Sequence, residues 1–282
     1  MRVDSHASPS HSWEMVHAVP APGLWPEVRR YCGYEERSAA PVRRREVPAP
    51  QVAVIISMGP SIEVIDSTAS TPARQRLGSF VASLNDAPSL TEYSGHQHGV
   101  EMNLGPLTAH RLFGLPMHEL TGRVVELEEV WGRPGARLPE MLHAAPGWEA
   151  RFDVLDRFIA GRLSEAPPPP IELSWAWGRL RRSGGSAPIG ALATELAWSP
   201  RRLVREFRAG LGMAPKSLAR LLRFERVTRR IHTEEAANLG HVALECGYYD
   251  QPHLNRDFRQ FAGTSPSEYM ARLMPAGGGV AG

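Results

Sequence analysis

Hydrophobic and polar positions divide the chain into a front half of short alternating runs and a back half of helical spacing. Val52–Ile56 is a short β-branched run, which favours a buried strand. Ser61–Asp66 and Val100–Leu104 alternate apolar and polar residues, as half-buried strands do. We expect Ser61–Asp66 to pair with Val52–Ile56 as a hairpin across the intervening Gly-Pro, and a short helix over Leu107–Phe113.

Helical spacing takes over after these strands. One apolar stripe recurs every three or four residues and predicts a helix that closes the strand-containing domain, with part of it able to form a dimer face. The stripe consists of Trp148, Phe152, Leu155, Ile159 and Leu163. The first 22 residues are polar and interrupted by prolines, so we predict a disordered tail there.

Four consecutive prolines, Pro167–Pro170, mark the domain boundary, because they donate no backbone hydrogen bonds and favour a stiff spacer. The predicted organisation is a tail (1–22), an N-terminal strand-containing domain (23–165), a Pro-rich linker with a connecting helix (166–187), a helical domain (188–274) and a flexible tail (275–282). The expected fold class is α+β: a strand-containing domain closed by helices, followed by an all-α domain.

The helical domain contains an internal repeat. At an offset of 50, Gly190, Ala193 and Glu195 recur as Gly240, Ala243 and Glu245. After a one-residue slip, the offset becomes 51, and a second set recurs: Leu203, Arg205, Phe207, Arg208, Gly212 and Pro215 as Leu254, Arg256, Phe258, Arg259, Gly263 and Pro266.

Each copy has the pattern of a helix-turn-helix. In the first copy, a short helix precedes Ser199, which can cap a second helix that begins with Pro200. In the second copy, Gly247 ends the short helix and Asp250 can cap the next one. A long basic helix, Leu218–Ile231, is expected to join the two units.

The second helix of each unit carries the side chains that read DNA bases. A helix fits the major groove, and Arg, Asn and Gln bond bidentately to guanine or adenine edges. The alternative is a solvated arginine face on an ordinary helical bundle, which the duplication of these polar positions disfavours. In the first unit the candidate DNA-binding residues include Arg201, Arg202, Arg205 and Arg208. In the second they include Gln251, Asn255, Arg256 and Arg259.

The formal net charge supports this assignment only when the two halves of the chain are counted separately. The whole chain has a formal net charge of +2. Residues 1–170 hold 16 Arg/Lys and 20 Asp/Glu, a net of −4, whereas residues 171–282 hold 16 and 10, a net of +6. A basic half attached to an acidic half indicates that the basic half meets a polyanion.

The repeat is similar to the C-terminal DNA-binding domain of AraC/XylS-type transcriptional regulators. Residues 199–207, 212–216, 247–258 and 263–266 carry the resemblance. It implies two helix-turn-helix units, each with its second helix in the major groove. By position it implies base reading by Arg201, Val204 and Arg205 in the first unit and by Gln251, Pro252, Asn255 and Arg256 in the second.

Two details qualify that resemblance. Val204 and Pro252 have no hydrogen-bonding side chain, so Val204 could at most touch a thymine methyl group. Ala197 replaces the glycine that often ends the first short helix.

The N-terminal half resembles the sensing domains of a subgroup of these regulators through Arg43–Pro48, Gly105-Pro106 and Leu112–Pro116. It implies effector sensing or dimerisation and names no ligand.

Other function classes have little support in the sequence. His96, His98 and Glu101 imitate a metal-binding box, the basis of an alternative reading as a metal-dependent enzyme tethered to DNA. An unbroken strand would place Glu101 on the face opposite the two histidines, and the stretch before His96 resembles a loop. Cys32 is weighed as a thiol sensor, and Cys246 is expected to pack in the core. We therefore expect no enzyme activity, no catalytic residue, no metal and no cofactor.

The sequence thus predicts a cytoplasmic, sequence-specific transcription regulator. Its expected partners are double-stranded promoter DNA, a small-molecule effector, RNA polymerase and a second copy of the chain, with no membrane attachment. A constitutive dimeric DNA binder without an effector remains an alternative.

Overall fold

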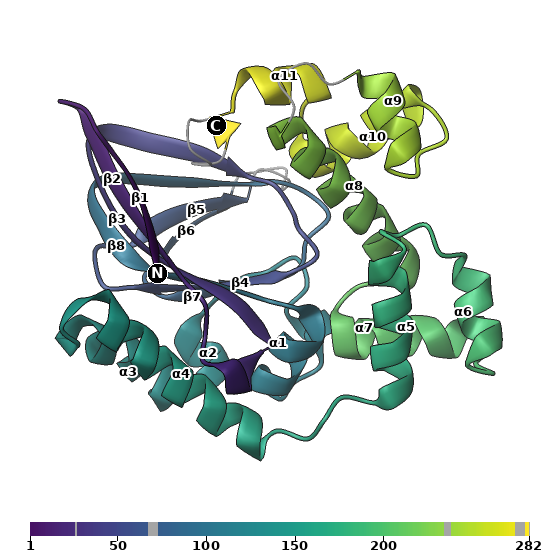
Figure 1. Ribbon diagram of the computed structural model, residues 1–282, viewed down its shortest axis with the longest axis horizontal. Helices are drawn as coiled ribbons and strands as arrows, with labels where there is room; N and C mark the ends of the chain where they lie inside the picture. The colour runs from purple at the N-terminus through teal and green to yellow at the C-terminus, as the bar shows by residue number, and fades with distance from the viewer. Residues whose placement is uncertain (26, 67–72, 234–237, 274–279, 282) are drawn as a thin grey trace.

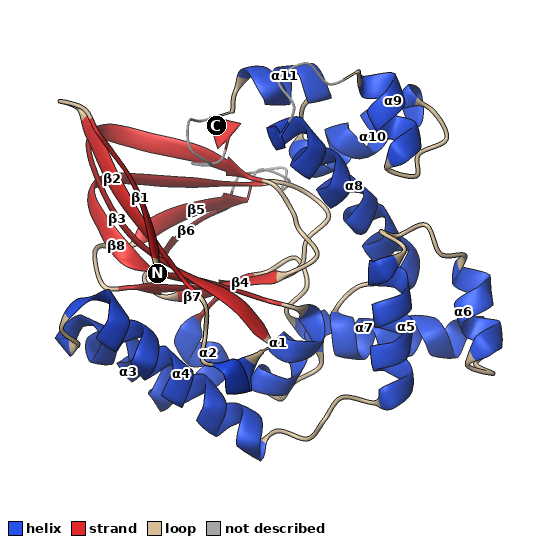
Figure 2. Cartoon of the chain, in the orientation of Figure 1, coloured by secondary structure: helices blue, strands red, loops and turns tan. Residues whose placement is uncertain are grey.

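The computed structural model describes residues 1–25, 27–66, 73–233, 238–273 and 280–281. An N-terminal antiparallel sheet with helices along one face is followed by a domain made of helices, as Figures 1 and 2 show. This confirms the α+β class and the all-α character of the C-terminal domain. No helix within the described ranges is long and apolar enough to cross a membrane.

The sheet follows the order β1-β2-β3-β8-β4-β7-β9; β5 joins it through β8, and β6 pairs with β5. Its strands are β1 (Arg2–Ala7), β2 (His11–Ala18), β3 (Val28–Glu46), β4 (Val52–Ser57), β5 (Ile62–Asp66), β6 (Ala73–Leu77), β7 (Phe80–Ala82), β8 (Ser89–Leu104) and β9 (Val124–Glu126). The long strands β3 and β8 form the centre, where Tyr34 lies opposite Gly99.

Two expectations about the strands are wrong. Residues 1–22 are not a disordered tail, because β1 and β2 extend the sheet and bury Val16 and Ala18. The strand at Ile62–Asp66 exists, but it pairs with β6 and β8 rather than with β4. One of its neighbours in the sheet, β6, is the next strand in the chain, whereas β8 is distant in sequence, and local alternation does not reveal either pairing.

The helices of the N-terminal domain are α1 (Pro106–Phe113), α2 (Leu127–Trp131), α3 (Arg133–Ala144) and α4 (Gly147–Glu165), with the 3-10 turns η1 (Pro22–Leu24) and η2 (Met117–Glu119). α4 packs on the outer face of β3, where Trp148 occupies the space that a side chain at Gly33 would need and Asp156 accepts a hydrogen bond from Tyr31. Phe152, Leu155 and Ile159 are buried, so this part of the predicted stripe is core.

The C-terminal half contains α5 (Ile171–Arg182), α6 (Ile189–Glu195), α7 (Pro200–Leu211), α8 (Pro215–Thr233), α9 (Leu239–Glu245), α10 (Gln251–Ala262) and α11 (Pro266–Ala271). The short strand β10 (Val280–Ala281) pairs with β3 at Arg44 and Arg45. Of the predicted flexible tail 275–282, only these two residues lie inside the described ranges.

Candidate nucleic-acid interface and ligand cavity

The two helix-turn-helix units are α6–α7 and α9–α10, joined by the long helix α8, which runs diagonally between them in Figure 1. Each second helix is capped as its sequence predicts. The Ser199 hydroxyl accepts a hydrogen bond from the backbone N–H of Arg202 (3.2 Å), and the Asp250 carboxylate accepts one from His253 (2.7 Å). The cap satisfies one of the free N–H groups at each helix start and fixes where the helix begins.

The same positions anchor both second helices in the core. Leu203 and Phe207 of α7 are buried, as are their repeat equivalents Leu254 and Phe258 of α10. Because these residues fix the rotation of each helix, the opposite faces point outward at equivalent places in the repeat.

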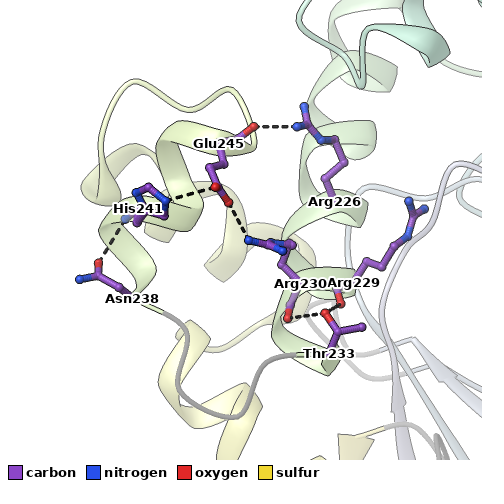
Figure 3. A network of polar contacts seen from close by, with 7 residues as sticks. All are labelled: Arg226, Arg229, Arg230, Thr233, Asn238, His241 and Glu245. Carbon is purple, nitrogen blue, oxygen red and sulfur yellow. Dashed lines mark hydrogen bonds and ion pairs between the residues drawn. The ribbon is translucent and has the colours of Figure 1, made fainter.

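A network of polar contacts holds α9 against α8 (Figure 3). Glu245 of α9 forms an ion pair with Arg230 of α8 (2.9 Å), and the Glu245 carbonyl accepts a hydrogen bond from Arg226 (2.6 Å). His241 lies 3.1 Å from the Glu245 carboxylate. On α10, Arg220 of α8 holds the buried Asp257 at 2.7 Å. These contacts position the second unit relative to the joining helix.

The predicted base-reading residues lie on these outward faces. Exposed side chains on α7 are Arg201, Arg202, Arg205 and Arg208, and on α10 they are Gln251, Pro252, Arg256 and Arg259; Val204 and Asn255 are partly buried. Three details go beyond the sequence. The Arg205 guanidinium contacts Glu206 (2.7 Å), Arg202 stacks over the Trp198 ring (4.6 Å), and Asn255 Oδ1 has no partner within the described chain.

Comparison with protein families fits this arrangement. Residues 192–272 match the model of a helix-turn-helix domain family. The chain carries a helix-turn-helix domain of the AraC type. A domain of this type binds DNA and regulates transcription. The AraC-type domain follows an N-terminal segment, residues 16–126, that matches a family described as a domain of unknown function (DUF6597).

Solved structures similar in shape include ToxT from Vibrio cholerae, at 10% identity and a TM-score of 0.48, covering 95% of this chain and 100% of that one. A ToxT structure with bound unsaturated fatty acid aligns at 12% identity with a TM-score of 0.48. The alignment covers 97% of this chain and 98% of that one. The C-terminal domain of AraT, a response regulator from Geobacillus stearothermophilus, aligns at 20% identity with a TM-score of 0.36. The alignment covers 39% of this chain and 92% of that one. These are distant similarities of shape. A comparison with curated protein sequences gives no match.

The concave face of the N-terminal sheet encloses a cavity of about 810 Å³. Alternation along β3 and β8 places Cys32, Tyr34 and Glu36, and on the facing strand Gln97 and Glu101, on this side. The Arg44 guanidinium binds both carboxylate oxygens of Glu36 at 3.1 and 2.7 Å. This polar interior was not predicted from the sequence, although the alternation with a period of two in both strands could have indicated that these polar side chains share one face.

The same alternation separates the residues of the imitated metal box. β8 is continuous through these positions, so the stretch before His96 is strand and not loop. The His96 and His98 rings stack 4.9 Å apart on the outer face, near His143 of α3, whereas Glu101 lines the cavity. These three side chains therefore cannot share one metal ion.

The N-terminal domain contacts the C-terminal ends of both second helices. The Thr121 hydroxyl donates to the carbonyl of Gly212, directly after α7, at 2.8 Å. The Arg45 guanidinium donates to the carbonyl of Ala262, the last residue of α10, at 3.3 Å. Gly212 and Gly263, which follow the two helices, are equivalent in the repeat, and a Cβ on either would lie 2.7 Å from the contacting Thr121 or Arg45 atom.

Proposed function

We propose that the protein regulates transcription by inserting α7 and α10 into two adjacent major-groove segments of promoter DNA, under the control of a small molecule bound in the N-terminal cavity. The observation that carries the proposal is the equivalent presentation of two capped helices. Both leave an N-terminal half exposed while the N-terminal domain occupies the C-terminal end. DNA therefore approaches the ends that carry the positive helix dipole, which favours contact with phosphate.

Each recognition helix combines base-reading and phosphate-binding side chains. Arg205 and Arg256 occupy equivalent positions and suit bidentate contact with guanine. Arg205 is 72% exposed in its ion pair with Glu206, so water screens the pair and its release for a base costs little. Arg208 and Arg259 lie one turn further on and suit phosphate contact. Val204 and Pro252 contribute shape rather than hydrogen bonds.

Substitution of the two proposed readers tests the proposal. Arg205→Ala and Arg256→Ala should each weaken binding to a footprinted site by about 1–3 kcal/mol and relax the preference at one base position. Gel-shift titration against the site and its single-base variants measures both effects. Unchanged affinity and base preference in both variants would overturn the assignment.

Arg208→Ala and Arg259→Ala are the matched controls, one on each helix. They should weaken binding to all sequences alike and reduce the dependence of affinity on salt, because each removes a phosphate contact and its released counterion. We assign no catalytic role to the chain, and RNA polymerase and a second copy remain proposed partners. In a constitutive binder without an effector, ligands would not alter the DNA affinity.

A further inference from the structure

Five carboxylates line the cavity on the concave face of the N-terminal sheet, and two of them, Glu36 and Glu101, lie in different situations. Glu36 is fully engaged, since Arg44 binds both its oxygens and the Tyr93 hydroxyl donates to it. Glu101 accepts a hydrogen bond from the neutral amide of Asn103 at 2.6 Å, and within the described chain no cation forms an ion pair with it. Glu101 therefore has acceptor capacity left for a ligand.

A second acceptor lies four residues away on the same strand, on the other side of the Tyr34 ring. Gln97 is 2% exposed, lines the cavity, and its Oε1 atom has no hydrogen-bond partner among the described residues. Gln97 and Glu101 lie on either side of Gly99, which faces Tyr34 across the strands. A buried acceptor without a donor is costly, so a ligand N–H group is favourable at Gln97, and Glu101 can accept a further one.

The electrostatic environment here is negative. The pKa of Cys32, directly opposite Glu101, is raised to about 11, first by burial and then by the Glu101 charge. The pKa of Tyr34 is raised as well, by burial and by Glu101 and Glu36. Both groups lie in the field of the Glu101 charge, which Arg30 opposes at Cys32 and Arg44 opposes at Tyr34.

The arginines that line the cavity do not remove this charge. Arg44 is held by Glu36, and Arg123 donates to the carbonyl of Glu119 at 3.1 Å. Arg30 is exposed and forms no ion pair with Glu101. Next to Glu101, β4 to β7 supply an apolar wall of Ile55, Val64, Leu77 and Phe80, in which Ile55 is paired with Glu101 across the strands.

We propose that this cavity binds an amphiphilic organic cation, whose ammonium group lies against Glu101 and whose apolar part lies against the wall of Ile55 and Phe80. The proposal deepens the effector control proposed above and rests on it for its consequence in transcription. The ammonium donates charge-assisted hydrogen bonds to Glu101, and the aromatic face of Tyr34 adds attraction for a cation.

Calorimetric titration of the full-length chain with matched ligands tests the charge preference. The probes are hexylamine, 2-phenylethylamine and spermidine, the neutral hexanol and 2-phenylethanol, and the anionic phenylacetate. At least one amine should bind in the millimolar range or tighter and exceed its neutral counterpart by about tenfold, and phenylacetate should bind weakest. If no amine exceeds its neutral counterpart, or phenylacetate binds best, the proposal is wrong.

Two substitutions with opposite expected signs locate the site. Glu101→Gln should reduce amine affinity about tenfold, because it removes the counter-charge and keeps the shape. Arg30→Gln should leave amine affinity unchanged or raise it, whereas a cavity for anions would lose affinity. Glu92→Gln is the matched control, since Glu92 lies on the same strand and faces Arg43 outside the cavity.

The outcomes separate this proposal from the proposed function. Ligand binding is measured without DNA, so failure of every amine contradicts the ligand class while the effects of Arg205→Ala and Arg256→Ala still stand. Amine binding that depends on Glu101, combined with unaltered DNA binding in both arginine variants, would instead contradict the DNA-reading proposal. If Glu101→Gln does not fold, as judged by circular dichroism, the probe comparison and Arg30→Gln still decide the case.

Discussion

Ala197, in the turn of the first helix-turn-helix unit, has a φ of 50°. Its counterpart in the second unit is Gly247, with a φ of 84°. The left-handed region costs a residue with a Cβ about 1–2 kcal/mol, whereas glycine adopts it freely. The turn geometry is therefore the same in both units, and the first unit maintains it at a conformational cost.

We expect Ala197→Gly to stabilise the protein by about 0.5–1 kcal/mol, since relief of the strained backbone exceeds the extra freedom that glycine adds to the unfolded chain. Urea unfolding monitored by circular dichroism measures the change. The reciprocal variant Gly247→Ala should destabilise, because a Cβ there meets both a positive φ and Arg223 Cδ at 3.3 Å. Equal stability of Ala197→Gly and the parent would show that the turn carries no strain.

Residue positions on a strand could be predicted from the sequence wherever the period of two was used. It anticipated that Glu101 would face away from His96 and His98, and the continuous β8 places them so. The role of Glu101 in the cavity could not be predicted, because it depends on Asn103 as its neighbour and on which cations lie nearby in space. Those contacts come from the register of the sheet.

Helices were predicted more accurately than strand partners, for a physical reason. Caps such as Ser199 and Asp250 act within three residues, so the sequence contains both ends of the interaction. The pairing of β5 with β8 joins distant segments, and β1 and β2 belong to the sheet only because β2 pairs with β3, while polar edge strands resemble a tail in composition. Val16 and Ala18, two residues apart, are the buried face of β2.

Val16 gives a test of whether β2 is an integral part of the fold. The side chain is 2% exposed, so Val16→Ala should cost about 1.5–2.5 kcal/mol through lost burial and the cavity it leaves. Val3, its partner across β1 and β2, is 55% exposed, and Val3→Ala should change stability by less than about 0.5 kcal/mol. Thermal unfolding of both variants measures the difference, which a disordered tail would not produce.

At the scale of the whole molecule, the N-terminal domain lies against both DNA-binding units at equivalent points. Thr121 holds the residue after α7, and Arg45 holds the end of α10. Arg44, next to Arg45 on β3, points into the cavity, because successive strand residues face opposite sides. The cavity and α10 therefore share one strand, so a ligand bound in the cavity, as proposed, would act on α10 through β3.

The division of charge between the halves predicted which domain meets DNA, but it did not predict this contact. The acceptors on the helical domain are backbone carbonyls, at Gly212 and Ala262, which any residue type could supply. A pattern of side chains in the sequence therefore cannot predict which backbone carbonyls accept these hydrogen bonds. The repeat could have indicated that the two positions are equivalent, since Gly212 and Gly263 correspond, but not that one domain holds both.

These two contacts fix the separation of α7 and α10 together with α8, so their loss should relax the spacing that the protein requires between its two DNA segments. One inserted base pair moves the second segment by about 3.4 Å and rotates it by about 35°. Arg45→Gln should reduce the affinity penalty for such an insertion by about threefold or more, while affinity for the optimal site changes little.

Thr121→Val makes the same test at the first unit. Arg43→Gln, two residues away on β3 and paired with Glu92, is the control, and gel-shift titration against sites of altered spacing is the measurement. Identical spacing penalties in Arg45→Gln and Arg43→Gln would mean that α8 alone sets the distance.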